Sequence, residues 1–448
     1  MQKRLDTIIS DGAVRLIAGL AAGFGVNVYL AGGGVRDCLL GRRVNDLDFA
    51  LGGASAELPP LFAEKWGGTF FWLDEERLQA RVVKKVAGAT FVHDFAPLRG
   101  TTIEDDLLQR DFTINALAIP ITGAAAHLVD PLQGRLDLRS KLVRTCSDHA
   151  FDDDPLRLLR ALRFAAELGF AVEEGTWDTL RHKTALLGSV AVERTRDELF
   201  RILAAPGIGA SFGKLGESGL LHEVFPAEIT WLKKRQTHGQ ERQAIASHIG
   251  TAVAVERVCG EFGRFFPGAE QSLAAYLGAE AEHGVTVRSL MMLAAFLGSD
   301  ERAGGAMLAE KLRLGRKAER LLGLLCRNEH GVFGMLERNA TERAMFRFFR
   351  DRAPGGPGLV IIALACGAVS APLSSRLIAY YVRDYDAEGG NLLLSGKEIM
   401  DISGIGEGKR VGEVMAELRE AESRGLVNDR EEARVFVKNL LTKEAPMR

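Results

Sequence analysis

The sequence predicts an α+β protein in which a small mixed or antiparallel sheet with helices comes first and an elongated series of helices follows. Short strand patterns bounded by glycines occur only up to Phe95. From Thr176 onward the apolar spacing is helical nearly to the end of the chain. The chain has 448 residues, which exceeds the size at which one hydrophobic core keeps growing, so we expect several domains.

We divide the chain into four parts by these patterns. They are a head (residues 1–140), a helical neck (141–230), a helical body (231–352) and a helical tail (359–448). The stretch 353–358, Ala-Pro-Gly-Gly-Pro-Gly, is typical of a loop and predicts a linker between the body and the tail.

The elements of the head follow from alternation and apolar spacing. The pattern before Val26 predicts a helix that packs behind the sheet. Gly67 and Gly68 end a later helix. The predicted helices after the first are at 35–40 and 58–66, and the predicted strands are at 26–30, around 46–48, and at 69–73, 79–86 and 89–95.

A glycine-rich turn lies between the first strand and the next helix. Gly32, Gly33 and Gly34 precede the helical pattern that starts at Val35. Glycine lets the backbone turn sharply and approach a ligand closely. The first N–H groups of a helix have no partner within it and carry partial positive charge. The turn therefore predicts a cradle for a phosphate group, with Arg36 as a further donor.

Two carboxylates follow the turn at a spacing of two residues. Side chains two apart in a strand point to the same face, so Asp46 and Asp48 are predicted to lie side by side. Such a pair repels unless a cation lies between, and Mg²⁺ prefers carboxylate and phosphate oxygens. The pair therefore predicts a Mg²⁺ site. Asp94, with His93 on the opposite face of its strand, is either a third carboxylate of this site or a partner for backbone or arginine donors.

These features resemble the nucleotidyltransferase signature of the DNA polymerase β superfamily, and specifically the bacterial-type (class II) CCA-adding enzymes and poly(A) polymerases. Four later blocks carry the same resemblance in the same order. They are Arg110–Ala118, Asp130–Leu138, Asp153–Arg157 and Glu193–Leu203. The resemblance covers the first half of the chain well and the second half more loosely. It implies a polymerase-β-like head in front of the helical parts.

The resemblance also implies a reaction, the template-independent transfer of nucleotides to the 3′ end of tRNA. Asp46 and Asp48 would be the catalytic residues and would hold Mg²⁺. The glycine turn with Arg36 and Arg110 would bind the triphosphate of CTP or ATP, and Asn115 would contact a sugar or a backbone group.

Asp154 and Arg157 stand at the predicted start of a neck helix, with Pro155 at its first position. Their spacing of three places both side chains on one helix face. An Asp acceptor beside an Arg donor matches the pairing edges of C and A and mismatches those of U and G. In the family this pair reads the incoming base, which implies the same role here. A helix cap is the alternative for Asp154.

Arg160 and Arg163 continue the spacing of Arg157 along the apolar stretch Leu156–Leu168. Burying such a stripe without anionic partners is costly. We therefore predict that these arginines line a cleft as further basic groups.

The body falls where some relatives carry a His-Asp metal phosphohydrolase domain. His238 and His248 lack the required His-Asp pair, since Asp300 has no adjacent histidine. We predict a helical body that is related to that domain but has no metal centre. The tail, with glycine-rich turns between amphipathic helices, resembles the RNA-binding tail of the family.

Composition excludes several other classes of protein. The net charge of −2 does not by itself indicate nucleic-acid binding, so an RNA site has to be local. The five cysteines are scattered and odd in number, which argues against a disulfide framework and a thiolate zinc site. No apolar run is long enough to span a bilayer, and no signal-peptide core follows the charged start. We expect a cytoplasmic protein with no membrane partner.

The stretch between the last head strand and Arg110 bears on which nucleotide is added. In full CCA-adding relatives a longer flexible loop here helps the site switch from C to A, whereas residues 96–103 run almost directly into the acidic run 104–106. Neutral variation in loop length is the alternative reading. We predict an enzyme that adds CC and relies on a separate A-adding enzyme. A poly(A) polymerase or A-adding enzyme, and a non-catalytic RNA-binding protein, are the other candidates.

Overall fold

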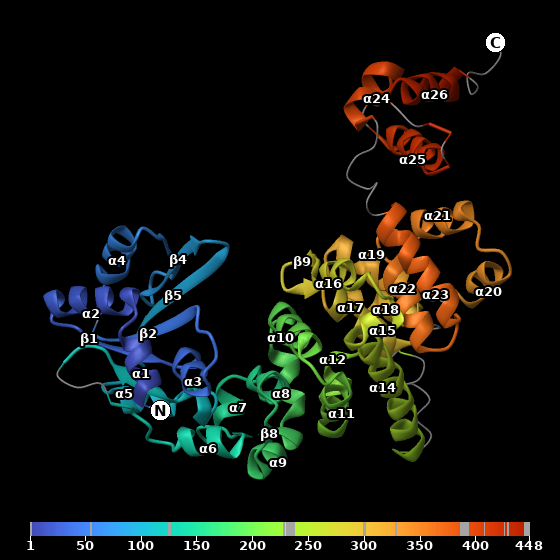
Figure 1. Cartoon of the computed structure of the whole chain (residues 1–448). Helices are drawn as coiled ribbons and strands as arrows, with labels where there is room; N and C mark the ends of the chain where they lie inside the picture. Colours follow the sequence, from blue (N-terminus) through green and yellow to red (C-terminus); the bar gives the residue numbers. More distant parts are fainter. Residues whose placement is uncertain are drawn as a thin grey trace. The chain divides into compact units, whose positions relative to one another are not determined.

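The computed structural model describes residues 2–53, 56–123, 127–226, 229, 238–298, 302–327, 329–385, 394–406, 408–424, 426–427 and 430–442. The chain forms two compact units, one of residues 1–191 with 218–223, the other of residues 192–217 with 224–448. The first contains the sheet and the second is helical apart from one short hairpin (Figure 1). The α+β class is confirmed, and the division into head, neck, body and tail stays a prediction.

The helices and strands of the first unit between residues 26 and 95 begin and end close to their predicted positions. In chain order they are α1 (Gln2–Ile9), α2 (Gly12–Phe24), β1 (Asn27–Ala31), α3 (Gly33–Leu40), β2 (Asp46–Gly52), α4 (Leu58–Trp66), β3 (Thr69–Asp74), β4 (Gln79–Val86), β5 (Ala89–Pro97), α5 (Ile103–Leu108), η1 (Thr113–Asn115), β6 (Ala118–Pro120), α6 (Gly134–Ser140), β7 (Leu142–Val143), α7 (Ala150–Asp153), α8 (Arg157–Leu168), β8 (Ala171–Val172), α9 (Glu174–His182) and η2 (Thr184–Ser189).

From residue 192 onward nearly every element is a helix. In chain order they are α10 (Val192–Ala204), α11 (Ile208–Ser218), α12 (Leu220–Val224), α14 (His238–Gly260), α15 (Phe262–Phe265), α16 (Glu270–Gly278), β9 (Glu280–Glu282), β10 (Val285–Thr286), α17 (Val287–Leu297), α18 (Arg302–Lys311), α19 (Arg316–Leu325), α20 (His330–Arg338), α21 (Glu342–Asp351), α22 (Gly356–Ala365), α23 (Ala371–Tyr380), the π-helical turn η3 (Tyr381–Tyr385), α24 (Gly396–Ser403), α25 (Lys409–Ser423) and α26 (Arg430–Thr442).

The head is built on a mixed six-stranded sheet with the order β3-β4-β5-β2-β1-β6. β2 and β5 run parallel, and the other neighbouring strands pair antiparallel. The five predicted strand segments are confirmed. The sixth strand, β6, was not predicted, because its three residues follow a turn and are too few to show alternation.

One face of the sheet, the back face, is covered by α2 and α4 (Figure 1). Phe62 and Trp66 of α4 contact the ring of His93 on β5, with centroids 5.4 and 4.4 Å away. Phe49 and Phe95, from the two parallel strands, stack at 5.2 Å on the same side. These rings bury a large apolar area and hold α4 against the sheet.

The opposite face, the front face, carries Asp46, Asp48 and Asp94. Helix α5 packs on part of it through a buried cluster of mostly small residues. The cluster consists of Ala31, Ala50, Ile103, Leu107, Ala116 and Ala118. Alanine on the strands lets the helix approach closely, while Asp46 and Asp48 at the start of β2 stay exposed. The packing therefore leaves the carboxylate end of the front face accessible.

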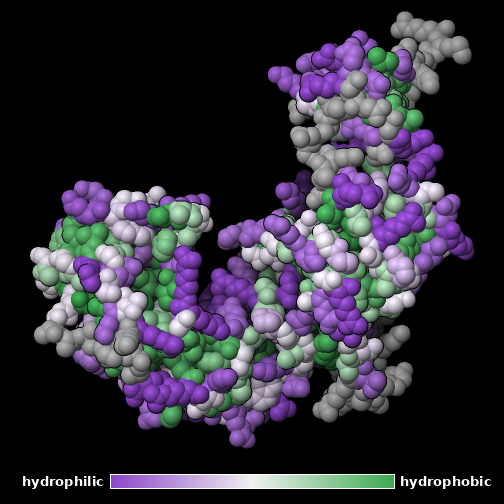
Figure 2. Space-filling view, viewed as in Figure 1, coloured by the Kyte–Doolittle hydropathy of each residue, from purple (hydrophilic) through white to green (hydrophobic). Residues whose placement is uncertain are grey.

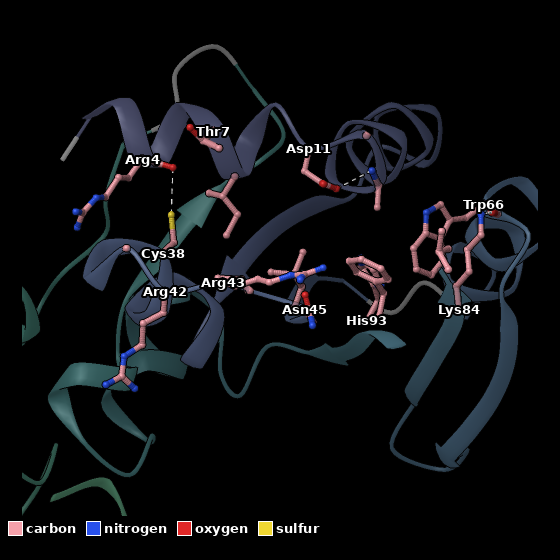
Figure 3. A pocket seen from close by; sticks show the side chains of 18 residues that line it. Arg4, Thr7, Asp11, Cys38, Arg42, Arg43, Asn45, Trp66, Lys84 and His93 are labelled. Carbon is pink, nitrogen blue, oxygen red and sulfur yellow. Dashed lines mark hydrogen bonds between the residues drawn. The ribbon is translucent and has the colours of Figure 1, made fainter. Parts of the chain in front are cut away.

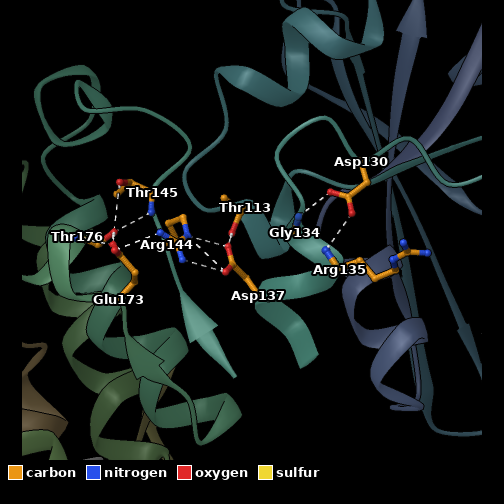
Figure 4. Close-up of polar contacts among 9 residues, drawn as sticks. All are labelled: Thr113, Asp130, Gly134, Arg135, Asp137, Arg144, Thr145, Glu173 and Thr176. Atoms are coloured by element: carbon orange, nitrogen blue, oxygen red, sulfur yellow. Dashed lines mark hydrogen bonds and ion pairs between the residues drawn. The ribbon is translucent and has the colours of Figure 1, made fainter. Parts of the chain in front are cut away.

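A polar network joins the head to the segment that follows it within the first unit (Figure 4). Arg144 forms ion pairs with Asp137, at 3.1 Å, and with Glu173, at 3.2 Å. The buried Asp137 also accepts a hydrogen bond of 2.7 Å from the Thr113 hydroxyl. A buried carboxylate has to be paired in this way. The network fixes the turn that leads to Asn115 against the neck.

The second unit is helical as predicted, with α17 buried along its whole length between α14, α19 and α22. The predicted linker at 353–358 is wrong. Gly356 and Gly358 lie buried in the first turn of α22, and the Tyr276 hydroxyl donates to the carbonyl of Pro354 at 3.0 Å. A Cβ at Gly356 would lie 2.6 Å from the Phe349 ring, so close packing and not flexibility explains the glycine.

Hydrophilic side chains cover much of the face in Figure 2. None of the helices in the described part of the chain has an apolar stretch long enough to span a membrane.

Candidate active site

The three carboxylates of the front face come together as the strand register dictates. Asp46 and Asp48 alternate with buried Leu47 along β2, and Asp94 is the register partner of Asp48 on β5. Among the described residues, none donates a hydrogen bond to the carboxylate of Asp46 or Asp48. Asp94 instead accepts two hydrogen bonds of 2.7 Å from Arg81, its partner on β4. Asp94 therefore lies beside the pair and binds an arginine, and its role as a third carboxylate of a metal site stays a prediction.

The electrostatic environment opposes ionisation of the carboxylate pair. Asp48 keeps an exposed edge, yet desolvation by the surrounding residues raises the pKa of its carboxyl to about 6. The charges of Asp94 and Asp46 contribute to this rise, and the charge of Arg110 opposes it. Desolvation and the charge of Asp94 likewise raise the pKa of Asp46, against the attraction of Arg81. A cation between the two oxygens would relieve this repulsion.

The glycine turn brings the backbone close to the carboxylate of Asp48. Gly32 precedes α3 at φ +79°, a conformation that favours glycine. A Cβ there would lie 2.7 Å from Nη1 of Arg110 and 3.2 Å from Oδ2 of Asp48. No side chain caps α3, so its first N–H groups remain available to a ligand. The turn, Arg110 and Asp48 therefore surround one space that a larger residue at position 32 would fill.

Arg110 reaches this space from the end of α5. Its guanidinium is held by Asp106, with Nε at 2.9 Å and Nη2 at 2.8 Å from the carboxylate. Nη1 is the atom that lies near Gly32. An arginine fixed on one side can still donate from the other, because the guanidinium carries five N–H groups.

Arg36 and Asn115, predicted to contact the nucleotide, form a buried pair. Nη1 of Arg36 donates to Oδ1 of Asn115 at 2.7 Å, and the rest of the guanidinium binds Asp37 at 2.8 and 2.9 Å. Asn115 in turn donates to Asp111 at 3.0 Å. Both side chains are therefore engaged within the protein, and their contact with a nucleotide stays a prediction.

Asp111 extends this chain of contacts to the neck. Arg160 of α8 binds its carboxylate, with Nε at 2.9 Å. Burial opposes ionisation, but Arg160 and the Asn115 amide hold the pKa of Asp111 below its usual value. Asp111 was not among the predicted site residues, and its position directly after Arg110 in the 110–118 block was the signal available.

The helix that carries the predicted base-reading pair begins later than predicted. α7 ends at Asp153, Asp154 is extended at φ −147°, and α8 begins at Arg157. Asp154 and Arg157 therefore do not share a helix face. Oδ1 of Asp154 accepts from the N–H of Leu156 at 3.2 Å, as a cap would. The buried Arg157 donates to the carbonyls of Ala150 and Gln109 at 3.2 and 2.9 Å.

The other two arginines of α8 differ from the predicted open stripe. Arg163 is 5 % exposed and lies 4.2 Å from the centroid of the Phe164 ring. Arg160 is half-buried and paired with Asp111. An acidic and an aromatic partner offset the cost of burying these charges, which the sequence could not reveal.

A Mg²⁺ ion suits the donor set of the front face. Asp46 and Asp48 supply hard oxygen atoms to which no described residue donates a hydrogen bond. Mg²⁺ is commonly held by one or two carboxylates together with substrate phosphates. Across the part of the chain that the structure describes, no group of three or more His, Cys, Asp or Glu is arranged to hold a metal by itself. Ser299, Asp300 and the side chain of His238 lie outside the described residues. The front face therefore fits a metal that a substrate helps to bind.

Comparison with protein families and known proteins gives consistent matches. The family model described as "Poly A polymerase head domain" matches residues 28–144. A second, described as "Probable RNA and SrmB- binding site of polymerase A", matches residues 169–230. The two models cover the head and much of the predicted neck.

Two relatives align over nearly the whole chain. A CC-adding tRNA nucleotidyltransferase of Geobacter sulfurreducens is 40 % identical over 450 residues, covering 100 % of both chains. An A-adding tRNA nucleotidyltransferase of Deinococcus radiodurans is 32 % identical and covers 91 % of this chain and 94 % of its own. The fold is similar to a Thermotoga maritima CCA-adding enzyme complexed with tRNA, with a TM-score of 0.62, 24 % identity and 98 % of each chain covered.

Proposed function

Since the chain belongs to the bacterial tRNA nucleotidyltransferases, we propose that it adds two cytidine nucleotides to the 3′ end of tRNA and leaves the terminal adenosine to a separate A-adding enzyme. The full-length match to a CC-adding enzyme supports the choice of cytidine. The A-adding relative makes adenosine addition the second candidate. We expect the enzyme and its tRNA substrate to be cytoplasmic.

The reaction joins two substrates without a template. The 3′-hydroxyl oxygen of the RNA bonds to the α-phosphorus of CTP, the bond from that phosphorus to the bridging oxygen breaks, and pyrophosphate leaves. The hydroxyl proton passes to solvent. Mg²⁺, when bound by Asp46 and Asp48, supplies positive charge that lowers the pKa of the hydroxyl and offsets charge on the phosphates. The exposed position of both residues, with the carboxylate of Asp48 beside the glycine turn, supports this assignment.

The residues around the glycine turn would orient the triphosphate. The uncapped N–H groups of α3, at Gly33 and Gly34, offer an anion site of the kind that phosphates occupy. Nη1 of Arg110 faces the same space. Arg36, in the first turns of α3, is held by its hydrogen bond to Asn115, so we assign the two residues a positioning role besides any direct contact.

Asp154 and Arg157 would select the base. The carboxylate of Asp154 would accept a hydrogen bond from the amino group of cytosine, and Arg157 would donate one to the ring nitrogen of cytosine. Arg157 already donates two N–H groups to carbonyls, which leaves others of its five for the base. A mismatched base would leave buried charged groups unpaired, which discriminates strongly.

The connection between β5 and α5 is the structural observation that supports the addition of CC. It spans only residues 98–102, and Thr102 caps α5 in a capping box with Asp105. Gln109 donates to the carbonyl of Arg99 at 2.6 Å, and Asp106 accepts from the N–H of Arg99 at 3.2 Å. A segment this short and this well anchored supports a base site that stays in one state, the state that accepts C.

A primer extension experiment tests the proposal. The purified protein is incubated with tRNA that ends at the discriminator base, at C or at CC, and with one labelled nucleotide at a time. We expect two, one and no additions of CMP, respectively, and no addition of AMP. Efficient AMP addition to tRNA ending in CC would contradict the CC-only proposal. Long A tracts on an unrelated RNA would identify a poly(A) polymerase, and no addition at all would favour a binding protein.

A further inference from the structure

A second pocket lies on the back face of the sheet, behind the strand that carries the candidate catalytic carboxylates. Its volume is about 720 Å³, within the range of small-molecule sites. Leu47 belongs to its lining, and the side chain of Leu47 alternates with those of Asp46 and Asp48. His93 of β5 lines it too (Figure 3). This back pocket is therefore separate from the candidate active site and shares β2 with it.

Two polar atoms at the back pocket have no hydrogen-bond partner among the described residues. They are Nδ1 of His93, a residue that is only 2 % exposed, and Oδ1 of Asn45. Leaving such atoms unpaired away from water is costly, so native proteins usually pair them. Figure 3 shows the two side chains close together in the middle of the pocket with Arg43 beside them. This group of three would gain hydrogen bonds from a ligand.

The charge of the lining favours an anion. Four cationic side chains belong to it, those of Arg4, Arg42, Arg43 and Lys84. The carboxylate of Asp11 also lies there, but it already accepts the first N–H groups of α2. Within the described residues Arg43 forms no hydrogen bond or ion pair, whereas the guanidinium of Arg42 donates to the carbonyl of Glu167. Arg43 is the cation best placed to bind an anionic group.

An aromatic surface completes the pocket. Phe91 of β5 is half-buried, lines the pocket and has no ring partner in the described part of the chain. The neighbouring Trp66 is covered by Phe62, stacked at 5.2 Å, and by the ammonium of Lys84, 5.1 Å from the ring centroid. A planar ligand would therefore pack on Phe91, near Trp66 but not on it.

We propose that the back pocket binds a mononucleotide, with the base on Phe91, the polar edge of the base toward Asn45 and His93, and the phosphate on Arg43. A nucleotide combines the planar ring, the hydrogen-bonding edge and the negative charge that these three groups require. Inorganic phosphate would leave Phe91 and the two polar atoms without a partner, and a free nucleoside would leave Arg43 without one.

Binding of AMP to the full-length protein tests the proposal. The titration is done in EDTA, so that metal-dependent binding at the front face is suppressed, and is followed by tryptophan fluorescence and by equilibrium dialysis with labelled AMP. We expect a saturable fluorescence change that Trp66→Phe removes while the dialysis signal remains. Arg43→Gln should weaken binding about tenfold, because a charged hydrogen bond to phosphate is lost.

Matched variants separate the back pocket from the front face. Lys85→Gln removes a charge from the next residue of β4, outside the pocket lining, and should leave the affinity unchanged. Asp48→Asn should also leave it unchanged. The proposal is overturned if AMP does not bind, if Arg43→Gln has no effect on binding, or if phosphate or adenosine alone binds as tightly as AMP. Loss of AMP binding in Arg110→Gln with retention in Arg43→Gln would assign the binding to the front face and would equally overturn it.

Discussion

Asp48 and Asp94 are register partners in the parallel ladder between β2 and β5, but they differ in their surroundings. Arg81 holds Asp94 by two hydrogen bonds of 2.7 Å, while the carboxylate of Asp48 has no donor among the described residues. One of two neighbouring carboxylates is thus neutralised by the protein and the other is left to a ligand. We therefore expect substitutions of Asp48 and Asp94 to have different effects.

Replacing either free carboxylate should remove nucleotide addition without unfolding the head. In Asp46→Asn and Asp48→Asn we expect the rate to fall about a hundredfold or more, because a metal ligand is worth several kcal/mol of transition-state stabilisation. Extension of labelled tRNA gives the rate, and the melting temperature should stay within a few degrees of the original. Asp74→Asn, on the edge strand β3, is the matched control. Near-full activity of both variants in Mg²⁺ would refute the assignment of these two carboxylates as the metal ligands.

Asp94→Asn should be much milder than Asp48→Asn. Its oxygens are already used by Arg81, so we expect a loss of less than about tenfold, mainly through changed repulsion at Asp46 and Asp48. Activity is measured over a range of Mg²⁺ concentrations. A loss as deep as that of Asp48→Asn, with a raised Mg²⁺ requirement, would instead identify Asp94 as a third metal ligand.

Asp154→Ala should relax the choice of nucleotide. We expect UTP or GTP to be incorporated at least about tenfold more efficiently relative to CTP, since a mismatched base no longer faces an unpaired carboxylate. Single-nucleotide kcat/KM values for the four triphosphates measure this. The side chain also accepts from the N–H of Leu156, so a fall in thermal stability with unchanged selectivity would mean that Asp154 is only a cap.

Gly134→Ala should destabilise the head. A Cβ at this position would lie 2.0 Å from the carbonyl oxygen of Thr113, so the turn that holds Asn115 has to move. We expect a loss of about 2 kcal/mol or more in the free energy of unfolding, measured with urea. Gly23→Ala, inside α2 with nothing within 4 Å of the added Cβ, is the control and should be neutral or stabilising. Equal stability of the two variants would mean that the turn adapts freely.

His93 should make the head less stable in mild acid. Burial lowers its pKa to about 4 in the folded protein, from a usual value of 6.5. The unfolded chain therefore binds a proton more readily between these values, and stability falls as the pH drops through them. The shift corresponds to about 3 kcal/mol at most. Urea unfolding near pH 7 and pH 5 should show a smaller drop in His93→Leu than in the original protein, with exposed His182→Gln as control. An identical drop in both would refute the assignment.

Local sequence patterns were sufficient for the elements that carry the site. Alternation along β2 and β5 placed Asp46, Asp48 and Asp94 on one face and His93 on the other, because side-chain direction in a strand depends only on position along it. The glycine turn before α3 was equally local, since a positive φ and an uncapped helix start follow from neighbouring residues.

Long-range pairing was decided only by the tertiary structure. The chain of contacts from Arg36 to Asn115, Asp111 and Arg160 joins residues 79 and 49 positions apart, and nothing in the local spacing indicates which arginine meets which acid. For the same reason Arg163 was predicted at a cleft and is buried on Phe164. The sequence determined which groups have the charge and polarity that a metal or a phosphate would require. Packing decided which of these groups remain available to a ligand, because a buried charged side chain pairs with the residues that the fold places next to it.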